Sequence, residues 1–286
     1  MNIKINERAL DVSFDNESTL GEVLAGLEQW LENMGHRVSS LNIDGEDISA
    51  SMIESVFSKE IDKIQHVSIQ TNAIAELMAA SLLNLIEDIK EYEHLDFKSK
   101  TIFFNKWIES ATAQFISAEI PDLHAFCVST FSDGKIASGT LTSITEEIQR
   151  EVTEPINEFT NMETVLIDTC ERLENLPLDI QTGKDSHAAQ SIQIFTAVTE
   201  KIFRLYRQLS IQGYLSESTQ EDSIEPLETQ ITDFNNVLKE LFEAYEKNDS
   251  VLIGDLAEYE ASPKLKNLFF TILKDVKNKD KTQGEL

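Results

Sequence analysis

Residues 19–35, TLGEVLAGLEQWLENMG, predict a helix with a defined start and a defined end. Thr19 and Glu22 stand three positions apart and match a capping box, a side-chain arrangement that begins many helices. Gly35 stands where a C-terminal cap belongs. The apolar residues between these signals recur at spacings of three and four and share one helical face. They are Leu20, Val23, Leu24, Leu27, Trp30, Leu31 and Met34.

Short strand patterns flank this helix on both sides. Before it, apolar and polar residues alternate over residues 3–5 and 10–14, which is typical of two paired strands. After it, an apolar stretch at 38–43 leads into an Asp-Gly pair at 44–45, which is typical of a tight hairpin turn. A last alternating segment at 67–69 predicts a further strand.

The order strand, strand, helix, strand, turn, strand over residues 1–70 resembles the ubiquitin-like β-grasp. The resemblance implies a small module that serves as a docking surface or a structural cap. Ubiquitin-like carriers end in Gly-Gly at a free C-terminus, whereas this chain continues as Gln70-Thr71-Asn72, so no carrier chemistry is implied. Partners of such a module are expected at its sheet edges or on its open face.

The pattern from residue 71 onward is helical. Glycine is absent between Gly45 and Gly134, and no proline precedes Pro121, so little interrupts a helix in this part. Each expected helix has one apolar face that needs a neighbour, which favours a multi-helix bundle or a helical-hairpin array. The predicted fold class is therefore α+β, predominantly α. The predicted domains are a β-grasp-like module over 1–70 and a helical region over 71–286, the latter divisible into 71–135 and 140–286.

Local signals predict where the helices begin and break. Asn72 and Ser99 are expected to cap the first two helices, and Pro155 is expected to bend or split a long helix near Thr153. Residues 122–139 fit either a strand and turn or a short helix after proline, and 176–185 read as a linker. A helix at about 223–247 is expected to bury one apolar face, made of Leu227, Ile231, Phe234, Leu238, Leu241, Phe242 and Tyr245.

The chain is strongly acidic, because 51 Asp and Glu stand against 24 Lys and Arg and give a formal net charge of −27. A surface of this sign repels phosphate groups, so we expect no nucleic-acid partner. No apolar run is long enough for a signal peptide or a spanning helix, so we expect a cytoplasmic protein without a membrane partner. Cys127 and Cys170 form no metal-binding or redox motif and are expected to be reduced thiols.

No pattern of catalytic or metal-binding residues stands out. Glu91 and His94 have the Glu-x-x-His spacing of di-iron bundles, but such a site needs a second pair and two more glutamates. Residues 134–139 have the GxxxxG spacing of a phosphate loop, but Thr140 stands where that motif requires lysine. We expect no catalytic residue, no metal and no cofactor, and the sequence leans away from an enzyme.

Charges in the C-terminal part separate into an acidic and a basic segment. Residues 216–246 carry nine acids and one lysine, a net of −8, whereas 264–281 carry six lysines and two aspartates, a net of +4. The favoured interpretation is that these lysines complement the helix dipole and the acidic body. The alternative is that they engage an acidic partner or a membrane. The residues expected to contact a partner are Lys264, Lys266, Lys274, Lys277, Asp255 and Glu258.

Gly254 is an unusual residue inside an expected helix, where glycine costs about 1 kcal/mol relative to alanine. Either another backbone approaches closely there, or the helix starts after this residue. The residues around it mix aliphatic bulk with acids, a pattern that fits an interaction face and amphipathic packing equally well.

These observations favour a non-catalytic cytoplasmic adaptor or regulatory scaffold that binds other proteins. One alternative is an acidic helical chaperone of the export type that holds a hydrophobic segment of its partner. A second is an enzyme whose site is assembled from dispersed residues, and a third is a structural homo-oligomer joined through the helices.

Overall fold

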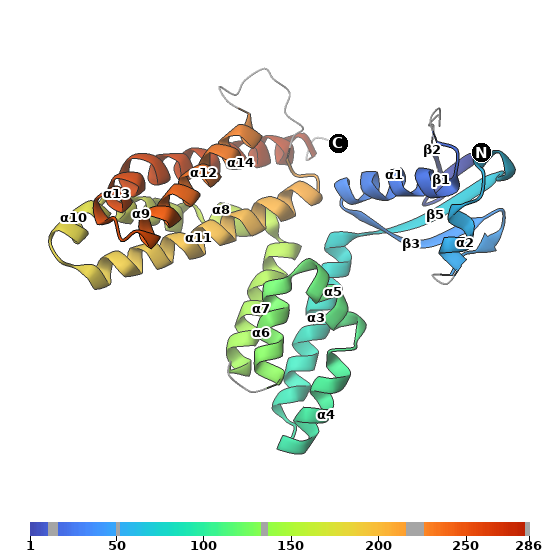
Figure 1. Cartoon of the computed structure of the whole chain (residues 1–286), viewed down its shortest axis with the longest axis horizontal. Helices are drawn as coiled ribbons and strands as arrows, with labels where there is room; N and C mark the ends of the chain where they lie inside the picture. Colours follow the sequence, from blue (N-terminus) through green and yellow to red (C-terminus); the bar gives the residue numbers. More distant parts are fainter. Residues whose placement is uncertain (11–16, 50–51, 133–136, 216–225, 284–286) are drawn as a thin grey trace. The chain divides into compact units, whose positions relative to one another are not determined.

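The computed structural model in Figure 1 describes the chain in five stretches, which are residues 1–10, 17–49, 52–132, 137–215 and 226–283. The chain divides into two compact units, Met1–Gln149 and Arg150–Leu286, named here unit 1 and unit 2. A small mixed sheet at the N-terminus is followed by helices, which confirms the predicted α+β, predominantly α fold class. The domain boundaries expected at residue 70 and at 135–140 stay predictions.

A five-stranded mixed sheet opens unit 1. Its strands are β1 (Asn2–Ile5), β2 (Arg8–Leu10), β3 (His36–Ile43), β4 (Glu46–Asp47) and β5 (His66–Ala73). They lie in the order β2-β1-β5-β3-β4, with β1 parallel to β5 and the other neighbours antiparallel. The predicted turn joins β3 to β4, because Asp44 and Gly45 have the positive φ values, 49° and 92°, that a two-residue hairpin turn requires. Of the strand expected at 10–14, Leu10 ends β2 and residues 11–14 lie outside the described part of the chain.

Helix α1 (Leu20–Asn33) packs on this sheet and confirms the predicted capping box. Thr19 Oγ1 accepts a hydrogen bond from the Glu22 backbone N at 3.4 Å, and Glu22 Oε2 accepts one from the Thr19 backbone N at 3.0 Å. Trp30 and Met34, expected on the buried face, are instead exposed. The core between helix and sheet contains Ile3, Leu20, Val23, Leu27, Leu31, Ile43, Val67 and Ile69.

Short elements and a group of helices complete unit 1. They are α2 (Ile53–Phe57), a 3₁₀ turn (Ile61–Lys63), α3 (Ile74–Glu93), α4 (Phe97–Trp107), α5 (Ala111–Glu119), α6 (Pro121–Phe131) and α7 (Ser138–Thr153), whose last residues belong to unit 2. Aromatic side chains form the centre of this group. Phe131 lies 4.8 Å from Tyr92, 5.4 Å from Phe103 and 4.9 Å from Trp107 between ring centroids. An ion pair between Arg37 and the buried Glu119 joins β3 to α5.

Two predicted helix caps are wrong. Asn72 lies inside β5, where it pairs with Arg37 of β3, and α3 begins directly after that strand. The cap of α4 is Asp96, whose side chain accepts a hydrogen bond from the Ser99 backbone N at 2.8 Å. For residues 122–139, the helix alternative is correct over α6, which begins at Pro121.

Unit 2 is a bundle of helices. They are α8 (Pro155–Asn161), α9 (Glu163–Glu174), α10 (Leu176–Gln181), α11 (Asp185–Ile211), α12 (Leu227–Glu246), α13 (Ser250–Leu256), a π-helical turn (Ala257–Ala261) and α14 (Ser262–Gln283). The predicted split at Pro155 is confirmed, because α7 ends at Thr153 and α8 begins at the proline. The linker expected at 176–185 is wrong over its first half. There, α10 buries Leu176 in the core and carries Pro177 in its first turn, where a missing N–H costs little.

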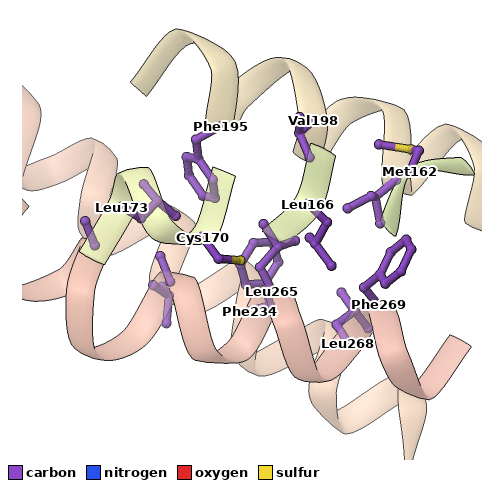
Figure 2. Close-up of a cluster of buried hydrophobic side chains, with 14 of the residues drawn as sticks. Met162, Leu166, Cys170, Leu173, Phe195, Val198, Phe234, Leu265, Leu268 and Phe269 are labelled. Atoms are coloured by element: carbon purple, nitrogen blue, oxygen red, sulfur yellow. The ribbon is translucent and has the colours of Figure 1, made fainter. Parts of the chain in front are cut away.

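One apolar core holds this bundle together. Figure 2 shows side chains of α9, α11, α12 and α14 pointing toward one another, among them Leu166, Cys170, Phe195, Phe234 and Phe269. All five lie within the buried cluster that runs through unit 2. Burying this much apolar surface is the main stabilising contribution to the bundle.

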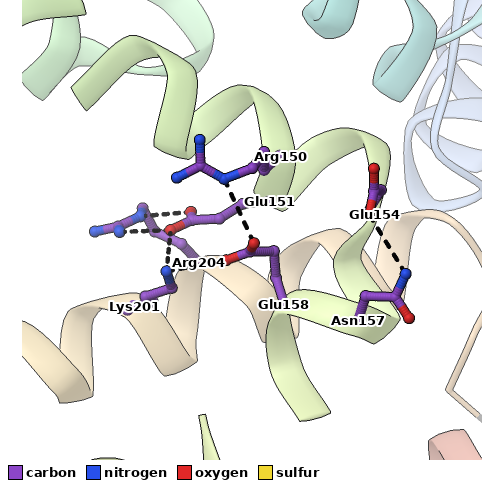
Figure 3. Close-up of polar contacts among 7 residues, drawn as sticks. All are labelled: Arg150, Glu151, Glu154, Asn157, Glu158, Lys201 and Arg204. Carbon is purple, nitrogen blue, oxygen red and sulfur yellow. Dashed lines mark hydrogen bonds and ion pairs between the residues drawn. The ribbon is translucent and has the colours of Figure 1, made fainter. Parts of the chain in front are cut away.

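A polar network ties the end of α7 to α11. The buried carboxylate of Glu151 accepts hydrogen bonds from Arg204 Nε at 2.9 Å and Nη2 at 2.8 Å, and Lys201 Nζ lies 3.8 Å away (Figure 3). Glu158 pairs with the same lysine at 3.1 Å and with Arg150 at 3.5 Å. The two parallel bonds from one guanidinium fix the relative position of the two helices.

Candidate protein-binding surface

The two cysteines are buried in separate units and lack the features of a nucleophile. Burial, with a smaller contribution from Asp88, raises the pKa of the Cys127 thiol to about 12. Burial also raises the pKa of Cys170, whose Sγ lies 3.7 Å from the Ser262 carbonyl oxygen. A catalytic cysteine needs the opposite shift, toward the thiolate at neutral pH.

These thiols are expected to resist Ellman's reagent in the folded protein at pH 8. With a pKa of about 12, roughly one Cys127 side chain in ten thousand is ionised at that pH, and the buried sulfur is shielded as well. Unfolding in guanidinium should release two reactive thiols. One equivalent that reacts within seconds in the folded protein would contradict this expectation and support a cysteine nucleophile, which Cys127→Ser would locate.

A metal site and a membrane-spanning helix each place specific requirements on the described residues. They contain no group of three or more His, Cys, Asp or Glu side chains placed to hold a metal ion. No helix among them combines the length and the apolar character needed to cross a membrane.

The lysines expected to contact a partner have different surroundings. Lys264 pairs with Glu260 at 3.0 Å, and Lys266 lies 3.8 Å from Glu174. Lys274 and Lys277 are exposed on α14. A lysine outside that expected set, Lys279, donates hydrogen bonds to the carbonyl oxygens of Gly213 and Leu215, at 2.6 and 2.5 Å, just beyond the C-terminal end of α11. Half of the expected lysines therefore already neutralise acids of their own chain.

An exposed face of α13 and the following π-helical turn gathers apolar and acidic side chains. Val251, Asp255 and Tyr259 are spaced four residues apart along this face. Leu252 and Glu258 lie beside them, three residues before and three residues after Asp255. The exposed fraction is 72% for Val251 and 65% for Tyr259. These five residues are named here the α13 face, and two of them, Asp255 and Glu258, belong to the set expected from the sequence.

The opposite side of the same segment is firmly packed. Ile253, Leu256 and Ala257 are buried in the core of unit 2. A Cβ added to Gly254 would lie 3.2 Å from Pro177 Cβ and 3.3 Å from its Cα, so the first of the two explanations for this glycine, close approach of another backbone, is confirmed. The α13 face is thus held on a rigid element.

Within the part of the chain that the structure describes, no base neutralises the acids of the α13 face. Residues 249–260 contain four acids and no base. Neither Asp255 nor Glu258 makes an ion pair with a described residue, although Glu258 accepts a hydrogen bond from the Tyr259 hydroxyl, which raises the tyrosine pKa. The face therefore combines exposed apolar area with uncompensated negative charge.

A second exposed apolar pair precedes this segment. Phe242 and Tyr245, expected on the buried face of their helix, are each 62% exposed on α12, which packs against α13. Phe234 of the expected face is buried, but Val237 and Ala244, which lie outside that face, are buried as well, so the buried side of α12 is displaced away from Phe242 and Tyr245. Residue type and spacing alone could not reveal these exposed aromatic side chains.

Comparison with known proteins identifies two matching regions. Residues 1–73, which end with β5, match the family described as TP0873 N-terminal domain, and residues 157–269 match a domain of unknown function, DUF8042. An uncharacterized protein of Treponema pallidum (strain Nichols) is 21% identical over 282 residues, which cover 96% of each chain. No solved structure matches this chain. The α13 face lies inside the second matching region.

Proposed function

We propose that this protein is a non-catalytic, cytoplasmic adaptor or regulatory scaffold that binds another protein through the α13 face. One observation supports the proposal above all others. Val251, Leu252 and Tyr259 are exposed, whereas the other side of the same segment is buried in the core of unit 2. Apolar side chains gathered on a rigid surface are typical of interaction sites. The two free, buried thiols support the cytoplasmic location, because reduced cysteines persist in reducing compartments.

We further propose that residues 1–73 form a β-grasp-like domain that acts as a structural cap. Support comes from the strand order, the parallel pair β1 and β5 at the centre, and α1 packed on one face. The opposite face is polar where these strands meet, because Lys4, Ser68 and Asn42 are neighbours across three strands. An apolar partner surface is thus better supported in unit 2.

Affinity capture with the full-length protein tests the adaptor function. Wild-type protein should retain a stoichiometric partner from an extract of its own cells. The double variant Val251→Ser/Tyr259→Ser should retain at least about tenfold less, because loss of two anchoring side chains weakens an interface by more than about 1.4 kcal/mol. Circular dichroism should show an unchanged fold.

A matched control removes two exposed apolar side chains elsewhere. Val165 on α9 and Leu83 on α3 are both about half exposed, so Val165→Ser/Leu83→Ser should capture the partner as well as the wild type does. Equal capture by both double variants, or no partner for the wild type, would reject the proposed function.

A further inference from the structure

We infer that the α13 face receives a basic amphipathic helix of the partner protein, with lysine or arginine placed between two apolar side chains. This inference rests on the proposed function and specifies the chemistry of the partner. It follows from the order of side chains along the face and from the charge that surrounds them.

The α13 face alternates apolar and acidic groups. Val251 and Tyr259 are eight residues apart, which corresponds to about 12 Å along a helix, and Asp255 lies midway between them. A partner that covers both apolar groups must also cover the carboxylate. Burying an unpaired carboxylate is costly, so a partner needs a cation at that position.

The distance between Val251 and Tyr259 also predicts the sequence pattern of a partner helix. On a helix, residues seven or eight apart are separated by about 11–12 Å and lie on the same side, with residues three or four apart between them. The complementary pattern is therefore an apolar residue, a lysine or arginine three or four positions later, and a second apolar residue three or four positions after that. An arginine in this position can also lie over the Tyr259 ring.

The charge of the chain argues against other occupants. A second copy carries the same net charge of −27, and anionic lipid or nucleic acid is repelled by the uncompensated acids of the face. The two basic residues that flank the face in sequence, Lys247 and Lys264, pair with Glu243 and Glu260. A cationic protein segment is the class of partner that this surface attracts.

Selection from a display library of random 16-residue peptides on the immobilised full-length protein tests the inference. Enriched peptides should contain the apolar, basic, apolar pattern. A synthetic copy of the most enriched peptide should bind Asp255→Lys/Glu258→Lys at least about tenfold more weakly than wild type, because two attractive contacts become repulsive. Asp255 is exposed and Glu258 is half-buried, and neither belongs to the core of unit 2, so the fold should be retained, as circular dichroism would verify.

A charge-matched variant separates a specific contact from general attraction to an acidic protein. Asp168→Lys/Glu171→Lys changes the net charge equally on the exposed side of α9 and should bind the peptide as the wild type does. Enriched peptides without basic residues, or equal binding by both charge-reversed variants, would overturn the inference while leaving the docking surface intact. Failure to enrich any peptide, or unchanged binding by Val251→Ser/Tyr259→Ser, would instead reject the proposed function.

Discussion

Replacing Phe269 by alanine is expected to lower the free energy of unfolding by about 3–5 kcal/mol. The Phe269 ring, labelled in Figure 2, is fully buried in unit 2. It stacks on Phe159, with ring centroids 4.5 Å apart and planes 15° from parallel. Alanine removes this contact and leaves a cavity between α14 and α8. Because native proteins are stable by only about 5–15 kcal/mol in total, the variant should unfold at much lower urea concentration.

The adjacent residue supplies a control of the same chemistry. Phe270 is 37% exposed, so Phe270→Ala removes the same atoms with less lost burial and should cost about 1–2 kcal/mol. Urea unfolding followed by far-ultraviolet circular dichroism measures both variants. Similar costs for the two alanine variants would show that Phe269 does not occupy the centre of the core.

Replacing Arg204 by methionine is expected to cost about 3 kcal/mol, because it leaves the buried Glu151 carboxylate without its main partner. Glu151 is 2% exposed in its side chain, and after the change Lys201, at 3.8 Å, is the partner that remains among the described residues. The opposite change, Glu151→Gln, should cost less. The Arg204 side chain is 39% exposed, so water can solvate the guanidinium when the carboxylate is lost.

A neighbouring ion pair provides the comparison. Arg150 lies 3.5 Å from Glu158 and its side chain is 54% exposed, so Arg150→Met should change the stability by less than about 1 kcal/mol. Both methionine variants keep the aliphatic part of the arginine side chain, so the difference between them measures the buried pair. A cost for Arg204→Met no larger than that for Arg150→Met would contradict the role assigned to the network in Figure 3.

The sequence predicts part of the candidate surface, but not which of its residues are exposed. The sequence indicated that Asp255 and Glu258 lie among aliphatic residues, and Gly254 indicated either a close approach of another backbone or a later start of the helix. It could not show which side of the segment faces the core, since a stripe at helical spacing is compatible with burial and with exposure. Packing against Pro177 settles this by occupying the Gly254 side.

Features that depend on residues close together in the chain could be predicted from the sequence. The capping box at Thr19 and Glu22, the turn at 44–45 and the helix break at Pro155 each involve groups within a few residues, so the local sequence suffices to predict them.

Features that depend on partners far away in the chain became visible only in the folded protein. Asn72 belongs to a strand because it pairs with Arg37, 35 residues earlier, and residues 176–181 are helical because Leu176 enters the core of unit 2. The exposure of Phe242 follows likewise from the side of α12 that its neighbours bury. Burial stabilises the face of a helix or strand that packs against another element. Which face this is depends on segments that are far apart in the chain.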